Sequence, residues 1–198
     1  MDDFYRPGHR SLQDQFDSRR LADRLGEITV LPAFSDRDRG LVEKAPFLWL
    51  ATSDADGWPD VSYKGGRPGF VKILDDTHLA FPSYDGNGMF RSLGNILDNP
   101  KVGLLFCDFD LPWRIRVKGT AEVIDDPASV ADWPGAELAV RVTINAVFPN
   151  CSRYLHKISV EEISANAPAE GYEPPEAEWK SMERIKDYLP GSKEAGAT

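Results

Sequence analysis

The chain has 198 residues with a hydrophobic fraction of 41%, which is enough for one packed domain and excludes wholesale disorder. Its formal net charge of -9 disfavours nucleic acid as a partner, because the phosphates would be repelled. No apolar run approaches the length that spans a membrane, and the charged N-terminal residues are unlike a signal peptide. We therefore expect a cytoplasmic protein with no membrane partner.

Two helices are predicted before residue 46. Apolar side chains recur at roughly helical spacing among charged residues: Leu12, Phe16, Leu21 and Leu25. This spacing predicts an amphipathic helix over residues 11–25, which Gly26 ends. A second helix is expected over residues 35–44, with the Ser35 hydroxyl as its N-cap. We assign residues 1–43 to a helical segment that packs on the main domain.

Short strands dominate the chain from residue 46 onward. Two hairpins are predicted over residues 46–66 and 69–82, because apolar or alternating runs flank turns rich in Asp and Gly. Further strands are expected from their alternation at residues 101–107, 113–123 and 138–147. A short helix is predicted at residues 90–97, and Pro100 prevents its continuation.

This pattern predicts a mainly β protein, a closed or split barrel of six to seven antiparallel strands with peripheral helices. We place the barrel at residues 44–163 and a partly flexible C-terminal extension, rich in Pro, Ala and Glu, at residues 164–198. Neither a GxGxxG motif nor a P-loop is present, which disfavours parallel nucleotide-binding folds. The two cysteines belong to no CxxC or Cys/His cluster, so no metal site is predicted.

Basic side chains gather at three places in this acidic chain, at residues 64–72, at Arg91 and at residues 114–118. Such clusters suit a small phosphorylated ligand, although each alone is more typical of a solvated strand face. In the first cluster, alternation puts Ser62 and Lys64 on one face of a strand and the neighbouring apolar residues on the other.

Two sequence blocks carry a family resemblance, RSLGNILDNPKVGLLF at residues 91–106 and RVKGTAEV at residues 116–123. Together with the order of strands, they make residues 44–160 resemble the FMN-binding split barrel of the pyridoxamine 5'-phosphate oxidase-like family. The runs SYKGG at residues 62–66 and FPNCSRY at residues 148–154 are similar to a predicted flavin-nucleotide-binding branch of that family, whose reaction is unassigned.

The resemblance implies FMN as the cofactor and a homodimer that holds it between subunits. The cofactor-binding residues that it implies are Ser62, Lys64, Gly65, Ser83, Asn87, Arg91, Ser92, Asn95 and Arg116, the last from the opposite subunit. Arg91 and Ser92 fall at a helix start, where unpaired amides and a guanidinium favour a phosphate. Gly65 and the glycine after it would let the backbone approach the cofactor closely.

The implied activity is that of an FMN-dependent oxidoreductase with a small-molecule electron donor or acceptor, for which NAD(P)H is one candidate. Two alternatives remain open: a non-catalytic flavin-binding carrier or sensor, and a split barrel that binds haem or a deazaflavin. Ser92 stands where the family's oxidases have lysine, and their C-terminal substrate signature is not recognisable. The sequence therefore does not support vitamin B6 oxidation.

No catalytic residue is predicted from the sequence. Cys151 invites interpretation as a nucleophile, and His156 follows in the same stretch, but no residue near it clearly acts as its base. Because a cysteine is commonly a small buried hydrophobe, we expect Cys151 to have a packing role.

Overall fold

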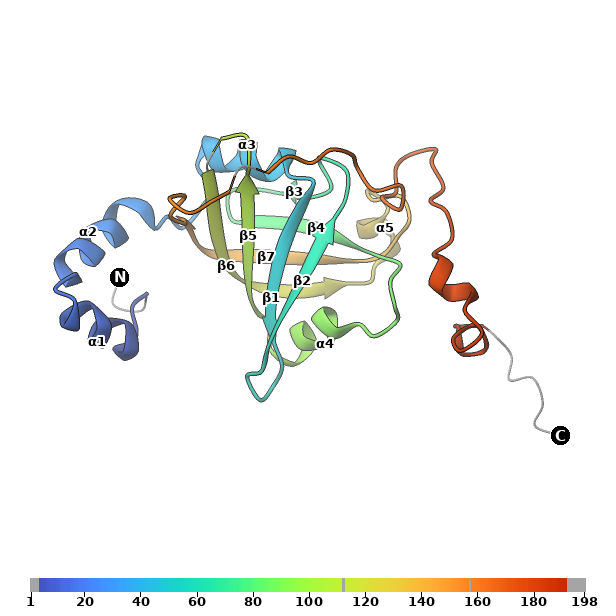
Figure 1. The fold of residues 1–198 in the computed structure, drawn as a ribbon, viewed down its shortest axis with the longest axis horizontal. Helices are drawn as coiled ribbons and strands as arrows, with labels where there is room; N and C mark the ends of the chain where they lie inside the picture. The colour runs from blue at the N-terminus through green and yellow to red at the C-terminus, as the bar shows by residue number, and fades with distance from the viewer. Residues whose placement is uncertain (1–3, 112, 157, 192–198) are drawn as a thin grey trace.

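The computed structural model describes residues 4–111, 113–156 and 158–191, and its seven strands form one antiparallel sheet in the order β2-β1-β5-β6-β7-β4-β3. The strands are β1 (Phe47–Ser53), β2 (Pro59–Gly65), β3 (Lys72–Ile73), β4 (His78–Tyr84), β5 (Lys101–Asp108), β6 (Trp113–Ile124) and β7 (Ala136–Pro149). Figure 1 shows β1, β5 and β6 running steeply across β4 and β7, so that the sheet curls around a core. The predicted split barrel is confirmed.

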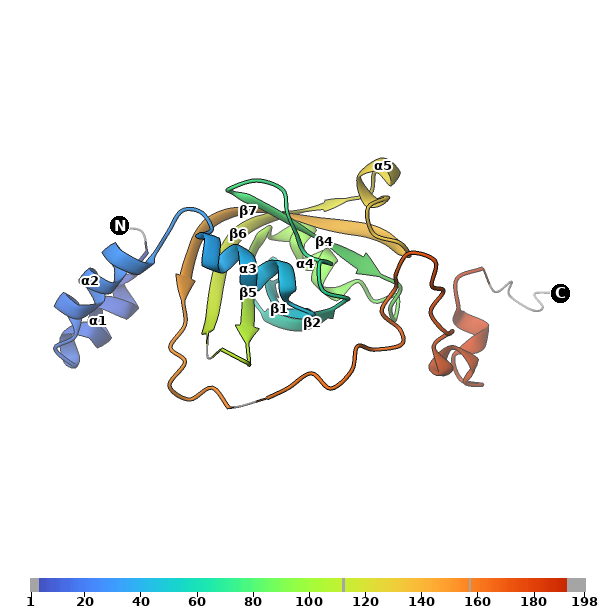
Figure 2. The same cartoon turned by 90° about the horizontal axis from the view of Figure 1, so that it is seen from above.

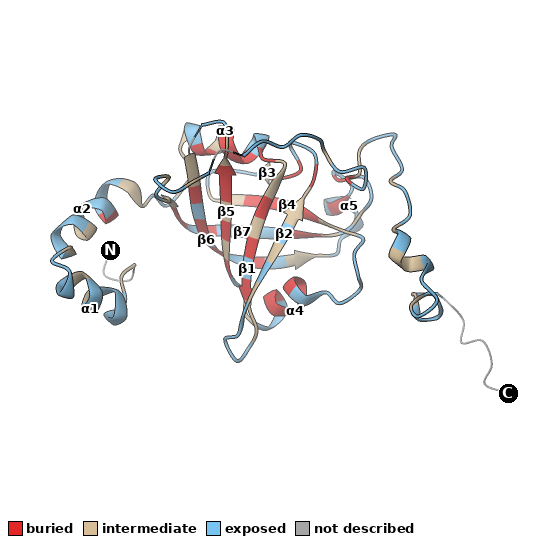
Figure 3. Cartoon of the chain, viewed as in Figure 1, coloured by how far each residue is buried: buried red, intermediate tan, exposed pale blue. Residues whose placement is uncertain are grey.

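Helices lie around the barrel rather than within it. They are α1 (Pro7–Gln15), α2 (Arg19–Thr29), α3 (Asp36–Lys44), α4 (Arg91–Asp98) and α5 (Pro127–Val130), with the 3-10 helices η1 (Glu178–Ser181) and η2 (Lys186–Tyr188). Buried residues concentrate in the strands, α3 and α4, whereas α1 and α2 are mostly exposed (Figure 3). In the described part of the chain, no helix has the length and apolar character needed to cross a membrane.

The core follows from the alternation of the long strands. In β6, Ile115, Val117 and Ala121 are buried, while Arg116 and Lys118 between them are exposed, as the sequence predicts. The inward side chains of the other strands complete the core, and they include Leu48, Leu50, Phe81, Phe106, Val140 and Val142. Burial of these side chains is the main favourable term for folding, because apolar surface leaves water.

A β-bulge bends the longest pair of strands. Lys118 lies opposite Ala146, but Gly119 lies opposite Ile144, so the β6–β7 register shifts by one residue. A Cβ atom on Gly119 would lie 2.5 Å from the Val142 side chain and 2.6 Å from the Thr143 carbonyl oxygen. Only glycine fits this close approach of backbones, and bulges of this kind increase the local bend and twist of a sheet.

Helix α4 closes one end of the barrel, where it packs against β1, β2 and β6. The Asn95 side-chain amide donates a 3.0 Å hydrogen bond to the Thr52 hydroxyl of β1, and both residues are buried. The Asn99 amide donates to the Ser53 hydroxyl at 2.8 Å. These two bonds fix the helix across the end of the sheet.

The prediction of a single N-terminal helix over residues 11–25 is wrong. The chain forms α1 and α2, which are separated where Asp17 adopts a left-handed backbone conformation with φ 49°. Asp tolerates this conformation better than most residues, and an Arg19–Asp14 ion pair spans the break. Gly26 does not end α2, which continues to Thr29.

The predicted capping of α3 is confirmed, because the Ser35 hydroxyl accepts a hydrogen bond from the Asp38 amide. Of the three N-terminal helices, α3 packs against the barrel strands β3 and β5. Helices α1 and α2 extend away from the barrel (Figures 1 and 2), and an isolated bridge between Leu31 and Val147 joins the following segment to β7.

The second hairpin is shorter than the sequence predicts. Its first strand is limited to Lys72–Ile73, because the chain turns at Gly69, where φ is +89°, and Phe70 and Val71 then enter the core. The segment after β7 runs past the barrel (Figure 2), and its described residues form no helix or strand until η1. The frayed C-terminal tail that the composition predicts lies in residues 192–198, outside the described residues.

Replacing Gly119 with alanine should lower the free energy of unfolding by about 1–3 kcal/mol, because the added Cβ overlaps backbone and core atoms. Gly40→Ala in α3 is the control. No atom lies within 4 Å of its added Cβ, and alanine in a helix interior should raise stability by about 0.5–1 kcal/mol. Urea unfolding followed by circular dichroism measures both. If Gly119→Ala unfolds at the same urea concentration as the wild type, the bulge does not require glycine.

Candidate functional site

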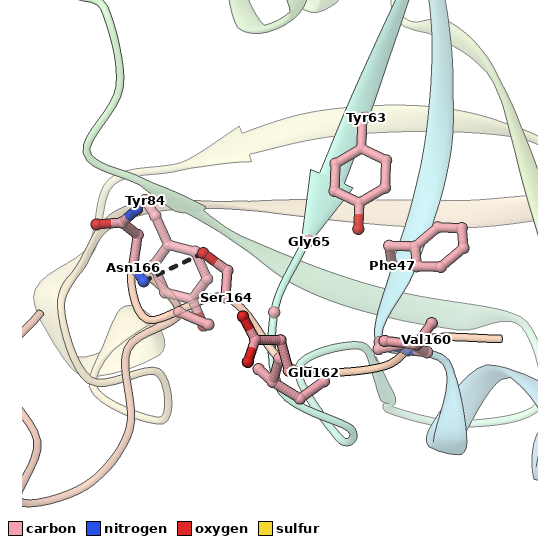
Figure 4. Close-up of a pocket in the computed structure, with 12 residues that line it drawn as sticks. Phe47, Tyr63, Gly65, Tyr84, Val160, Glu162, Ser164 and Asn166 are labelled. Carbon is pink, nitrogen blue, oxygen red and sulfur yellow. Dashed lines mark hydrogen bonds between the residues drawn. The ribbon is translucent and has the colours of Figure 1, made fainter. Parts of the chain in front are cut away.

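The two edges of the sheet leave an opening between β2 and the second half of β4. A cavity of about 270 Å³ lies at this opening. Phe47 and Tyr63 lie on one side of it, and Tyr84 lies on the other, beside Ser164 and Asn166 (Figure 4). Gly65 at the end of β2 also lines it, and the C-terminal segment contributes Val160, Glu162, Ile163, Ser164, Asn166 and Ala167. Burial raises the pKa of Tyr63 and of Tyr84, so both phenols stay neutral at physiological pH.

Strand β2 carries polar side chains on its inward face. Ser62 and Lys64 lie opposite Leu50 and Leu48 of β1, which are fully buried, so both polar residues point to the interior side of the sheet. Burial lowers the pKa of Lys64, while the nearby Asp60 carboxylate acts in the opposite direction. Among the described residues, no carboxylate lies within ion-pair distance of the Lys64 ammonium. A half-buried cation of this kind favours an anionic ligand.

The N-terminus of α4 lacks a side-chain cap. Its N-cap residue, Phe90, has φ 47° and ψ 28°, a left-handed conformation that is strained for a bulky residue, and makes no side-chain hydrogen bond to the first turn. Arg91 is exposed, and within the described chain it has no ion-pair or hydrogen-bond partner. Free amides, the helix dipole and an unpaired guanidinium are features that favour an anion at a helix start.

The other residues predicted on this side take different places. Ser83 is half-buried on β4, directly before the cavity residue Tyr84. Asn87 lies in the exposed loop between β4 and α4, where its side-chain oxygen accepts from the Met89 amide at 3.0 Å. Ser92 is buried in the first turn of α4. Ser83 is therefore adjacent to a cavity residue, Asn87 lies in the loop that leads to α4, and the backbone amide of Ser92 belongs to the uncapped first turn.

Two of the predicted residues have close contacts within the chain. The Asn95 side chain is buried against Thr52, so it holds α4 in place, and it does not line the cavity. A Cβ on Gly65 would lie 2.8 Å from the Tyr63 ring, and one on Gly66 would lie 2.5 Å from the Phe70 side chain. Packing within the chain therefore favours glycine at both positions, and the predicted approach of a cofactor to Gly65 stays a prediction.

Arg116 lies apart from the residues of the opening. It is on the outer face of β6, where its guanidinium donates a 2.9 Å hydrogen bond to the Asn150 side-chain oxygen. It lines a second, larger groove of about 810 Å³ between the N-terminal residues and the barrel wall. Within one chain, the structure does not bring Arg116 together with Lys64 and Arg91.

The outward face of the first sheet edge is apolar, which is the reverse of what a solvated strand shows. Val61 and Tyr63 of β2 are 66% and 60% exposed, while their polar neighbours point inward. Trp49 and Ala51 of β1 are their register partners, and Leu105 of β5 continues the surface. We call these five residues the outer apolar face. An exposed apolar patch of this kind marks an interaction surface.

The expected packing role of Cys151 is wrong. Cys151 is exposed in the loop after β7, and its carbonyl oxygen accepts a hydrogen bond from the Arg114 guanidinium at 2.8 Å from Nε. Cys107 is the buried cysteine, and burial raises the pKa of its thiol. No described group of three or more His, Cys, Asp or Glu residues is arranged to hold a metal ion.

The fold is thus a split barrel with an uncapped helix start that carries an exposed arginine. The model of the pyridoxamine 5'-phosphate oxidase family matches residues 34–167, which is more than half of the chain. The chain belongs to the pyridoxamine 5'-phosphate oxidase family.

Solved structures agree with this assignment. A candidate pyridoxamine 5'-phosphate oxidase from Lactobacillus delbrueckii is 27% identical, with a TM-score of 0.50, over 61% of this chain and 99% of that one. A point variant of HupZ from Group A Streptococcus is 19% identical, with a TM-score of 0.50, over 59% of this chain and 98% of that one, and shows the shared fold alone. No match was found among curated proteins.

The buried Asn95–Thr52 bond should matter for stability. Asn95→Ala should lower the free energy of unfolding by about 1–3 kcal/mol, because the Thr52 hydroxyl loses its buried partner. The control Asn87→Ala in the exposed loop should change it by less than about 0.5 kcal/mol. Chemical unfolding of both variants tests this. If Asn95→Ala keeps its stability but loses flavin binding, the main role of Asn95 is contact with the flavin, as the sequence predicts.

Proposed function

We propose that this chain is an FMN-binding flavoprotein, an FMN-dependent oxidoreductase whose substrate is unassigned. The observation that carries the proposal is the start of α4, where an uncapped helix end meets an arginine with no partner in the described chain. Lys64 adds a half-buried ammonium with no ion-pair partner among the described residues. Two cations and free amides would together suit a phosphate dianion.

The residues present fit two parts of FMN, its phosphate and its ribityl chain. Arg91, Lys64 and the amides of the first turn would hold the phosphate, and the hydroxyls of Ser62 and Ser83 suit a polar ribityl chain. Asn87 retains a free side-chain amide donor beside them. When bound, FMN supplies the redox chemistry, and the protein supplies binding, orientation and electrostatics. This role needs no nucleophile, so the exposed Cys151 has no assigned step.

The functional unit that we propose is a homodimer with FMN at its interface. The outer apolar face would be removed from water by a second copy, and Arg116 would then approach the opening of the partner chain. The chain would act on a small-molecule electron donor or acceptor, with NAD(P)H as the first donor to test. The two free cysteines are consistent with a reducing cytoplasm as its compartment.

A flavin-binding carrier or sensor would share the same site, so binding alone does not separate it from an enzyme. The decisive measurement is the rate at which NADH or NADPH bleaches the bound flavin in the absence of oxygen. We expect either NADH or NADPH to reduce the bound flavin fast enough to support turnover. A flavin that stays oxidised with both nicotinamides would favour the carrier, as would a chemically reduced flavin that stays reduced with common acceptors.

Arg91→Ala should weaken FMN binding by roughly one to two decades, because charge-assisted hydrogen bonds to the phosphate are lost. Riboflavin has no phosphate and should lose much less. Arg20→Ala, an exposed arginine on α2, is the control and should change neither affinity. Quenching of flavin fluorescence during titration of apoprotein measures all three. Equal losses for FMN and riboflavin would mean that Arg91 supports the fold and not the phosphate.

The dimer is tested at Val61, which lies on the outer apolar face. Val61→Glu would place an unpaired carboxylate in the proposed interface, and the variant should be monomeric while it remains folded. Leu74→Glu is the control, because Leu74 is also half exposed but lies in the turn before β4. Multi-angle light scattering reports the mass of each. A monomeric wild-type protein that binds FMN tightly would refute the shared site.

A further inference from the structure

The aromatic cavity is a compartment separate from the basic opening that it adjoins. Gly65 and Tyr84 line it, and each is the direct sequence neighbour of a residue that we assign to the cofactor, Lys64 and Ser83. Lys64, Ser83 and Arg91 are themselves absent from its walls. The cavity therefore lies beside the proposed flavin site without sharing its positive charge.

Glu162 is the one charged side chain among the described residues that line this cavity. No described Lys, Arg or His lines it, and the other polar side chains, such as Ser164 and Asn166, are neutral. Figure 4 shows the Glu162 carboxylate between the backbone of its own segment and the side chains of Ser164 and Tyr84. Within the described chain, Glu162 has no ion-pair partner.

A cavity lined by three aromatic rings and one carboxylate distinguishes between ligands by the sign of their charge. An anion in this cavity would be repelled by Glu162 and would meet no compensating cation. An organic cation would be attracted both by the carboxylate and by the aromatic rings of Phe47, Tyr63 and Tyr84. The net charge of -9 favours the approach of a cation further.

The C-terminal segment that carries the exposed Glu162 is fixed to the barrel from Ala167 onward. Ala167 is buried, and Pro168 packs over Gly135, where an added Cβ would lie 3.2 Å from the proline ring. Farther along, Tyr172 lies under the Arg67 guanidinium, 5.5 Å from its ring centroid, just after β2. The Lys180 ammonium forms a 2.6 Å ion pair with Asp85, just after β4. The C-terminal segment thus spans both edges of the opening.

We propose that the cavity binds a substrate bearing a compact or flat organic cation, an ammonium or pyridinium group, and that Glu162 determines this specificity. The redox role of the cation rests on the proposed function, because only a neighbouring flavin would make it a reaction partner. Its binding needs no flavin. The basic opening would hold the anionic cofactor, and the acidic cavity would hold the cationic substrate.

The probe for this site is the N-methylnicotinamide cation, with neutral nicotinamide as the matched ligand of the same ring. Isothermal titration of the full chain, with and without FMN, should show the cation binding about fivefold to tenfold more tightly than nicotinamide. Glu162→Gln should abolish that preference. Glu161→Gln should retain it, because Glu161 is the adjacent carboxylate of the same segment and does not line the cavity.

A second pair of variants tests the aromatic wall. Tyr84→Phe keeps the ring and should bind the cation as the wild type does, whereas Tyr84→Leu should bind it about threefold more weakly. Equal affinities of cation and nicotinamide, or an unchanged preference in Glu162→Gln, would overturn the proposal. Competition between FMN and the cation for one site would also overturn it, since the flavin would then occupy the cavity.

The flavin function and the cation site in the cavity can be refuted separately. A chain that binds the cation through Glu162 but does not bind FMN would retain the cavity assignment and refute the flavin function. A chain that binds FMN but shows no preference for the cation would retain the flavin function and refute the cavity assignment.

Discussion

The site depends on the bend that Gly119 allows in the sheet. The bulge at this glycine shifts the β6–β7 register, and β7 then carries β4 around the core toward the far edge strand, β2. An unbent sheet would leave β2 and β4 at opposite ends of seven strands. Because the sheet curls without pairing its two edges, their unpaired ends form an opening, and the C-terminal segment completes the walls of the cavity there.

Several residues in this part of the chain lower its local stability. Lys64 points inward, where burial disfavours its charge, and Val61 on the same strand points outward into solvent. Phe90 adopts a left-handed conformation that costs on the order of 1 kcal/mol at the start of α4. Inverted polarity, an unpaired cation and backbone strain in one region are accounted for together if a ligand pairs the charges and a second subunit covers the apolar face.

The sequence predicts the barrel well because alternation is a local signal. Apolar and polar residues alternate along β6, and this alternation predicts which side chains point inward and which outward. The Ser35 cap is predictable because it involves one side chain and an amide three residues later. The break at Asp17 was missed because helical spacing of apolar residues continues across it. The cavity was missed for a different reason: Tyr63 and Tyr84 meet Glu162 across about eighty to a hundred residues of chain, and no periodicity reports such a contact.

The central claim, that this family member holds a flavin nucleotide, is tested most directly by the visible absorption spectrum of the freshly purified protein. We predict the two flavin bands, in the near ultraviolet and the blue, either as purified or after incubation with FMN and removal of the excess. A Soret band would identify a haem protein instead. A chain that stays colourless after incubation with FMN would contradict the assignment of Lys64, Arg91 and the start of α4 to a flavin phosphate.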